Sequence, residues 1–179
     1  MRTLTLIAIA VLAASAARIA APAHSRPGRA LTCGIERWRV KTLQDRPHLI
    51  PARWTSVSHL VGLTPPRSVP ATRLPFERHL YSVIAAVTLV RQEADQDLHL
   101  VLQRGSKHMI AEAPNAPFCT ANATVYRKRQ MASARAKVQL CPRAHVVGVA
   151  FWDYFHHQTG VAPNAIELHP ILGFDCLTA

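Results

Sequence analysis

The chain lacks the short motifs that mark most enzyme classes in a sequence. It contains no His-x-His or His-Glu-x-x-His pattern, which excludes the common zinc-hydrolase signatures. No serine, threonine or cysteine stands in a context typical of a nucleophile. No two of the four cysteines have the close spacing of zinc ligands, so a structural zinc site is not expected. The sequence therefore names no reaction, and function has to be inferred from weaker patterns.

Long apolar runs are scarce, and only the beginning of the chain contains one. Thr3–Ala17 follows a basic residue, and Ala21–Ala23 offers the small-residue exit of a cleavage site. This order predicts a secretory signal peptide over residues 1–23. A membrane-spanning helix is the alternative, but the run is shorter than about 20 residues and Arg18 interrupts it. We therefore expect a secreted or periplasmic protein without a membrane span.

Acidic residues are few: the chain has 10, against 21 lysines and arginines, and its formal charge is +11. Cleavage after Ala23 would remove Arg2 and Arg18, leaving 19 basic and 10 acidic residues and a charge of +9. A positive balance favours anionic partners such as nucleic acid, acidic polysaccharide or phospholipid head groups. The same charge also promotes solubility, and the sequence does not separate these two consequences.

Four cysteines follow the predicted signal peptide, and an even number in an exported chain indicates disulfides. Three pairings are possible. We favour Cys33–Cys176, which would tie the two ends of the domain together, and Cys119–Cys141, which would close a loop around one helix. The thiols are then structural.

The first part of the mature chain is expected to be irregular. Residues 24–75 form an N-terminal arm rich in proline. Within this arm Ser56 can cap a short helical turn, and Trp38 and Trp54 can anchor the arm on the rest of the protein. The regular domain is expected over residues 76–179.

Period-two alternation predicts five strands, over residues 79–92, 98–104, 107–113, 146–152 and 165–171. A helix is expected over residues 121–139, capped by Thr120 or Asn122 and blocked from extension by Pro142. Three strands, a helix and two strands is the order of the OB-fold. The predicted fold class is therefore mainly β: a five-stranded OB-like Greek-key barrel with one α-helix between strands 3 and 4, preceded by the irregular arm. A two-layer α+β sandwich is the alternative.

Polar side chains are dense between the last two predicted strands. OB-folds bind oligomers with this loop and with the loop between the first two strands. We therefore expect a binding surface at the barrel mouth, where aromatic and amide groups suit the recognition of bases or sugars. Its members would be Trp152, Tyr154, His157, Gln158 and Asn164. Gly160 and Asn164 fit a shaped turn equally well.

Glu167 and His169 lie two residues apart on the last predicted strand and share a face. A carboxylate beside an imidazole can orient it as a general base, so both residues are catalytic candidates, together with His157. A buried ion pair would give the same pattern. A metal is a further interpretation, since His156 or His157 could join Asp153 or the same glutamate as ligands for zinc, manganese or iron.

Four segments resemble those of a family of small secreted bacterial proteins: Glu36–Thr42, Leu98–Leu102, Met109–Glu112 and His157–Pro170. The last of them reads His-Gln-Thr-Gly-Val-Ala-Pro-Asn-Ala-Ile-Glu-Leu-His-Pro, and the resemblance extends over nearly the whole mature chain. It implies an exported OB-like domain and no particular activity. The family pattern has Gly at the position of Ala165.

Residues 93–114 are similar in layout to the start of the thermonuclease barrel, which is itself an OB-fold. This resemblance implies a site for calcium or another divalent cation at Asp97 and Glu112, with Lys107 beside the phosphate. Lys107 stands where that family has an arginine, and it cannot clamp a phosphate with two parallel hydrogen bonds. Asn115 stands where the family has its catalytic glutamate, so another residue would have to supply the base.

Three functions fit these patterns. The first is an exported, non-catalytic binding module for an anionic or polar polymer, nucleic acid or polysaccharide, with no cofactor and with Lys107 at the binding surface. The second is a metal-assisted phosphodiesterase with Asp97 and Glu112 as cation ligands. The third is a structural or protein-interaction domain of the cell envelope.

Overall fold

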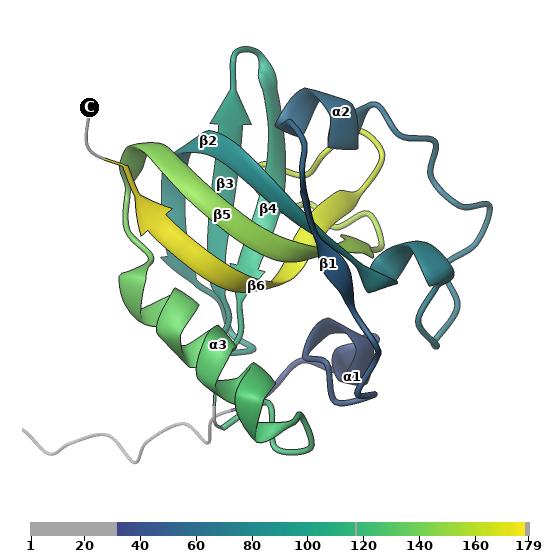
Figure 1. Cartoon of the computed structure of the whole chain (residues 1–179). Helices are drawn as coiled ribbons and strands as arrows, with labels where there is room; N and C mark the ends of the chain where they lie inside the picture. Colours follow the sequence, from purple (N-terminus) through teal and green to yellow (C-terminus); the bar gives the residue numbers. More distant parts are fainter. Residues whose placement is uncertain (1–31, 117, 178–179) are drawn as a thin grey trace, which may run out of the picture. The chain divides into compact units, whose positions relative to one another are not determined.

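The computed structural model describes residues 32–116 and 118–177, and five of its strands close into a β-barrel (Figure 1). The order around the barrel is β2–β3–β4–β6–β5, and β2 also pairs with β5, which completes the ring. The bounds of the strands are His79–Gln92 (β2), Leu98–Arg104 (β3), Lys107–Ala113 (β4), Cys141–Trp152 (β5) and Ile166–Cys176 (β6).

The order and direction of these strands confirm the predicted OB-fold. Neighbouring strands are antiparallel except for β4 and β6, and the helix α3 (Val125–Lys137) connects the third barrel strand to the fourth. A two-layer sandwich would leave the edges of its sheet unpaired, whereas here the first and fourth barrel strands pair with each other. No helix in residues 32–116 and 118–177 is long and apolar enough to cross a membrane. The predicted signal peptide, residues 1–23, lies outside the described residues.

One face of each barrel strand points into an apolar interior. The interior cluster takes side chains from all five strands, among them Val83, Leu100, Met109, Val146 and Leu168. These residues are the apolar members of the period-two pattern, because successive side chains on a strand point to opposite faces. Polar residues between them consequently lie on the outer face of the barrel.

The N-terminal arm contains more regular structure than expected. It forms two short helices and one strand: α1 (Trp38–Lys41), β1 (Ile50–Trp54) and α2 (Val57–Val61). The 3₁₀ helix η1 (Pro75–Arg78) follows where the arm meets the barrel. Strand β1 pairs in parallel with the first residues of β2. The predicted cap is confirmed, since the Ser56 side chain accepts a hydrogen bond from the backbone N–H of His59 at 3.0 Å. Leu31–Ala179 makes up one compact unit, and the predicted boundary at residue 76 stays a prediction.

A buried ion pair fastens the arm to the barrel. The two terminal nitrogens of Arg37 each donate to a different carboxylate oxygen of Glu77, both at 2.7 Å. Arg37 also donates to the carbonyl of Trp152, and Glu77 accepts from the backbone N–H groups of Trp152 and Leu74. The guanidinium lies over the ring of Phe151, 4.5 Å from its centre. These contacts join α1, η1 and the end of β5.

The predicted disulfide pairing is wrong. The bonds are Cys33–Cys119 and Cys141–Cys176, with Cα–Cα distances of 5.5 and 5.9 Å. The reason for the second bond is the register of two strands, because β5 begins at Cys141 beside the end of β6 at Cys176. Cys119 lies before α3, where the arm passes. All four thiols are bonded, which confirms their structural role.

Three predicted element boundaries also change, and one of them is the end of β6, which continues to Cys176, five residues past the predicted end. Helix α3 begins at Val125 with Thr124 as its cap, not Thr120 or Asn122. Strand β5 begins at Cys141, five residues before the predicted start, and it includes Pro142. Proline is tolerated near the start of a strand, where no ladder bond requires its missing N–H.

Candidate functional site

Polar residues from three barrel strands gather on the outer face of the barrel. On β6, Glu167 and His169 flank the interior residue Leu168 and therefore point outward. His99 on β3 is directly opposite Glu112 on β4 in the strand register. All four side chains are nevertheless buried. With Asp97, which precedes β3, they form what we call the carboxylate–histidine centre: Asp97, His99, Glu112, Glu167 and His169.

His169 lies in the middle of this centre. Its Nδ1 is 2.9 Å from Glu112 Oε2 and 3.2 Å from Glu167 Oε1, and its Nε2 is 3.2 Å from Asp97 Oδ2. Burial by itself would lower the pKa of His169, but the three carboxylates raise that pKa well above its usual value. In the absence of another cation, these carboxylates favour the protonated form of His169.

His99 links the centre to the β5–β6 loop. Its Nδ1 is 3.1 Å from Glu112 Oε1, and its Nε2 donates to the carbonyl of Thr159 at 2.8 Å. Burial by itself would raise the pKa of Glu112, but hydrogen bonds from His169 and His99 lower that pKa below its usual value. The loop turns at Gly160, whose φ of 89° is the positive value expected from the sequence. A Cβ at this position would collide with Val101 of β3.

The buried ionisable groups do not balance in charge. Lys41 of α1 reaches the centre, with its Nζ 2.8 Å from Asp153 Oδ2 and 3.9 Å from Glu167 Oε1. The set therefore has four acids and three bases: Asp97, Glu112, Asp153 and Glu167 against Lys41, His99 and His169. Burial and the neighbouring Asp153 raise the pKa of Glu167 to about 7. A buried excess of negative charge is unfavourable, and Arg135 near Asp97 and His156 beside Asp153 offset part of it. A proton on Glu167 or a further cation would offset the rest.

Asp97 is the least satisfied member of the centre. Its side chain has 0 % exposure, and neither carboxylate oxygen has a hydrogen-bond partner among the described residues. The 3.2 Å contact with His169 Nε2 is an ion pair whose geometry does not make a hydrogen bond. Burial raises the pKa of Asp97, and His169 offsets this only in part. A cation at this point would satisfy a carboxylate whose nearest donor, His169 Nε2, is not aligned with it.

Three residues of the centre can act together as metal ligands. Asp97, Glu112 and His169 each offer one ligand atom, and these atoms all lie within 4.8 Å of one another. Asp97 and Glu112, predicted from sequence, do converge as a shared cation site requires. The imidazole changes the preferred ion, because a mixed set of carboxylate and imidazole suits zinc or manganese better than calcium, which takes oxygen ligands.

A hollow of about 570 Å³ opens beside the centre. Its walls come from the arm, from the β2–β3 loop and from the β5–β6 loop, and Glu112 is the member of the centre that lines it. Lys41 and Asp153 also face this hollow. The two barrel loops are those with which OB-folds bind ligands. We call this space the loop hollow.

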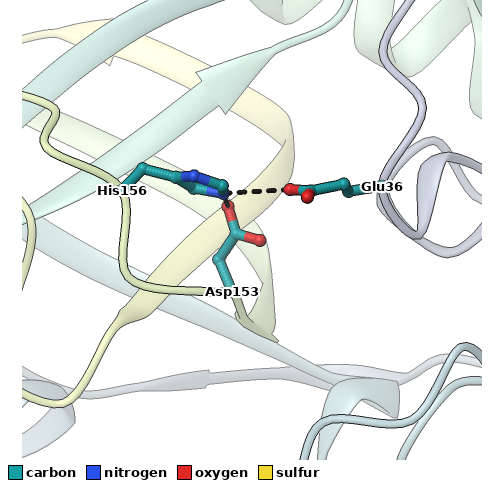
Figure 2. A group of neighbouring side chains, drawn as sticks. All are labelled: Glu36, Asp153 and His156. Atoms are coloured by element: carbon teal, nitrogen blue, oxygen red, sulfur yellow. Dashed lines mark ion pairs between the residues drawn. The ribbon is translucent and has the colours of Figure 1, made fainter.

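Three side chains at the loop hollow form a second His–carboxylate group. Figure 2 shows His156 between Glu36 of the arm and Asp153. Its Nε2 is 3.2 Å from Glu36 Oε2 and 3.7 Å from Asp153 Oδ2. Asp153 is already engaged, since Oδ2 contacts Lys41 and Oδ1 accepts from the N–H of Tyr154. This group joins the arm to the β5–β6 loop, and its three ligand atoms lie within 4.8 Å of one another, as a metal site at His156 and Asp153 would require.

Three of the five residues predicted to form a binding surface, Trp152, Tyr154 and Asn164, line one hollow of about 460 Å³. Asn164 is buried, donates to the carbonyls of Leu60 and Leu63, and accepts from the N–H two residues on, as its turn role predicted. Trp152 is 4 % exposed. Gln158 lines the loop hollow, whereas His157 and Tyr154 are exposed. Lys107 begins β4, at the opposite end of that strand from Glu112, and cannot act with it.

Sequence reasoning missed His99 and Lys41. The hairpin over 98–104 and 107–113 was predicted correctly, and its register alone places His99 opposite Glu112. That signal was present in the sequence. No comparable signal exists for Lys41, because the four-residue helix α1 is too short for a helical period to show where its side chains point.

No protein-family model and no curated protein sequence matches the chain. Among solved structures, it is similar to an aspartyl-tRNA synthetase from Entamoeba histolytica, with a TM-score of 0.44, 12 % identity and coverage of 70 % of this chain and 24 % of that one. It is also similar to a protein assigned as aspartyl-tRNA synthetase from Leishmania major Friedlin, with a TM-score of 0.45 and 15 % identity. That match covers 70 % of this chain and 21 % of the other. A third match is the asparaginyl-tRNA synthetase of E. histolytica in complex with asparaginyl-adenylate, with a TM-score of 0.36 and 10 % identity. It covers 55 % of this chain and 20 % of the other. The chain thus spans less than a quarter of each of these proteins, and likeness at this level carries no inference about activity.

Proposed function

We propose that the chain is an exported, metal-dependent phosphodiesterase in which the carboxylate–histidine centre holds a divalent cation beside the loop hollow. The observation that carries this proposal is the convergence of Asp97, Glu112 and His169 within 4.8 Å, with neither oxygen of Asp97 accepting a well-aligned hydrogen bond. Perturbed ionisable groups beside a hollow are typical of functional sites. Export is supported by the predicted signal peptide and by the two disulfides, which form in oxidising compartments.

The charge of the loop hollow restricts how an anionic substrate could enter it. Glu36, Asp95, Glu112 and Asp153 line the hollow, against one lysine. A phosphate alone would be repelled by these carboxylates. A divalent cation at the centre would offset part of this negative charge and would polarise a phosphoryl oxygen as a Lewis acid. Cation and substrate are therefore expected to bind together, and substrate without cation is expected not to bind.

Glu167 is suited to act as the general base that Asn115 cannot supply. Its pKa of about 7 lies near neutral pH, where a base both accepts a proton readily and is partly ionised. Glu167, Asp153 and Gln158 line a second, smaller hollow of about 10 Å³, which is close to the volume that one water molecule needs. Lys41 lies 3.9 Å from Glu167 and stabilises its ionised form.

Hydrolysis assays on the oxidised full-length chain test this proposal. Single-stranded DNA, RNA and a small phosphodiester would be incubated with zinc, manganese, calcium or a chelator. We expect hydrolysis only with a divalent cation, and its loss in Asp97→Asn and Glu112→Gln. Asp175→Asn is the matched control, because it removes an exposed carboxylate that is paired with Lys137. Equal inertness of the wild type under all conditions would contradict the proposal.

Non-catalytic binding of a polymer is the second candidate, and the burial of the centre favours it. His169 and Asp97 have no exposed surface, so substrate could reach a cation only from the side of Glu112. In this case the cation would be structural, and the variants would lose thermal stability and ligand binding without any hydrolysis to lose. If the protein bound neither a cation nor a polymer, the remaining candidate would be a structural or protein-interaction domain of the cell envelope.

A further inference from the structure

An exposed tryptophan lies on the outer face of the barrel, away from the loop hollow. Trp54 ends β1, is 66 % exposed, and stacks on His145 of β5 with ring centres 4.8 Å apart and an angle of 25° between the planes. Strand β1 lies along β2 (Figure 1). Since one indole face covers His145, the other is open to solvent. Trp54 was expected to anchor the arm on the rest of the protein, but most of its surface is exposed to solvent.

Two arginines stand beside this stack. Arg104 and Arg143 line a hollow of about 320 Å³ together with Trp54, Thr55, Ser56 and Ile84. Arg104 ends β3, and Arg143 is near the start of β5. We call Trp54, His145, Arg104 and Arg143 the Trp54 patch.

The arginines of the Trp54 patch have no acidic partner among the described residues. Away from the loop hollow and its centre, the carboxylates are already paired: Glu77 with Arg37, Asp45 with Arg73, Glu93 with Arg91, and Asp175 with Lys137. Asp175 is opposite His145 in the strand register, but its carboxylate is 2.8 Å from Lys137 Nζ. The patch therefore presents uncompensated positive charge next to an open aromatic face.

We propose that the Trp54 patch binds single-stranded nucleic acid, with a base stacked on Trp54 and the adjoining phosphates on Arg104 and Arg143. A base would extend the existing Trp54–His145 stack, and such stacking does not depend on base identity. The planar guanidinium groups match phosphate oxygens with two parallel hydrogen bonds. The hollow has the size of a small-ligand site.

The Trp54 patch is separate from the carboxylate–histidine centre. Arg104 and Asp97 lie at opposite ends of β3, seven residues apart, which corresponds to roughly 23 Å along an extended strand. The proposal does not depend on metal binding or hydrolysis. Its measurement can therefore be made with a chelator present, where the centre holds no cation and the nucleic acid stays intact.

Fluorescence anisotropy of a labelled oligothymidylate of about 12 nucleotides tests the proposal, because single-strand sites on such barrels span roughly 4–16 nucleotides. We expect Trp54→Ala to weaken binding about 5- to 150-fold, the range for loss of one stacked base. Trp54→Phe should restore most of the affinity. Arg104→Gln and Arg143→Gln should each reduce the slope of log affinity against log salt by about 0.7.

Arg129→Gln is the matched control, since it removes the same charge from an exposed position on α3. It should leave the affinity close to that of the wild type. The proposal is overturned if Arg129→Gln weakens binding as much as Arg143→Gln, because the attraction would then come from net charge alone. It is also overturned if Trp54→Ala has no effect, or if the Trp54-dependent ligand is a sulfated polysaccharide and the oligonucleotide does not bind.

Discussion

The Arg37–Glu77 pair allows a quantitative test of how the arm is held. The two side chains are 2 % and 0 % exposed and make two parallel hydrogen bonds at 2.7 Å. Glu77→Gln would keep the size of the side chain and leave the guanidinium buried without its counter-charge. Breaking such a pair from one side costs about 3–5 kcal/mol. For a protein of this size, this corresponds to a fall in Tm of roughly 6–20 °C.

Urea and thermal unfolding of the oxidised protein would measure this effect. The control is Asp175→Asn, which breaks an ion pair of similar length whose side chains are both more than half exposed. Exposed pairs contribute about 0–1 kcal/mol. If Glu77→Gln cost no more stability than Asp175→Asn, the buried pair would not hold the arm on the barrel, and the reasoning would be refuted.

Three further predictions concern local features. Ala165 has a φ of 56°, a left-handed conformation that disfavours side chains, so Ala165→Gly should raise the free energy of unfolding by up to about 1 kcal/mol in urea titration. Replacing Cys33 and Cys119 by serine opens a loop of 86 residues and should lower the free energy of unfolding by about 4.6 kcal/mol. Replacing Cys141 and Cys176 opens a loop of 35 residues and should lower it by about 3.8 kcal/mol, so the first variant should have the lower Tm in thermal unfolding. The folded protein raises the pKa of Glu167 from 4.5 to about 7 and that of His169 above 6.5, so it binds more protons than the unfolded chain at intermediate pH. Without added metal, the free energy of unfolding should therefore fall as the pH rises from about 5 to 8, and Glu167→Gln should make this fall shallower.

The barrel could be predicted from the sequence because its strands follow a strict period of two. The first three strands have the predicted bounds, and the turn between β3 and β4 brings His99 opposite Glu112. The same regularity made Glu167 and His169 recognisable as a pair on one face. Register between neighbouring strands thus carries much of the information about the centre.

Features that depend on the arm could not be predicted in this way. Lys41 enters the centre, and Cys33 reaches Cys119, only because an irregular segment folds back over β4 and β6. Spacing along the chain says nothing about such a path, so the disulfide pairing was wrong. The dense polar loop was also misleading at Asn164, because an amide that shapes a turn and an amide that binds a ligand look the same in a sequence.

The cation content of the folded protein tests the central claim most directly. The oxidised chain would be stripped with chelator, dialysed against zinc or manganese at neutral pH, and analysed for bound metal, with thermal unfolding to verify that each variant is folded. We predict one bound cation per chain and a higher Tm in the wild type and in Asp175→Asn, and neither effect in folded Asp97→Asn or Glu112→Gln. Binding of the same amount of metal by Asp97→Asn, or no metal binding by the wild type, would contradict a cation site at Asp97, Glu112 and His169.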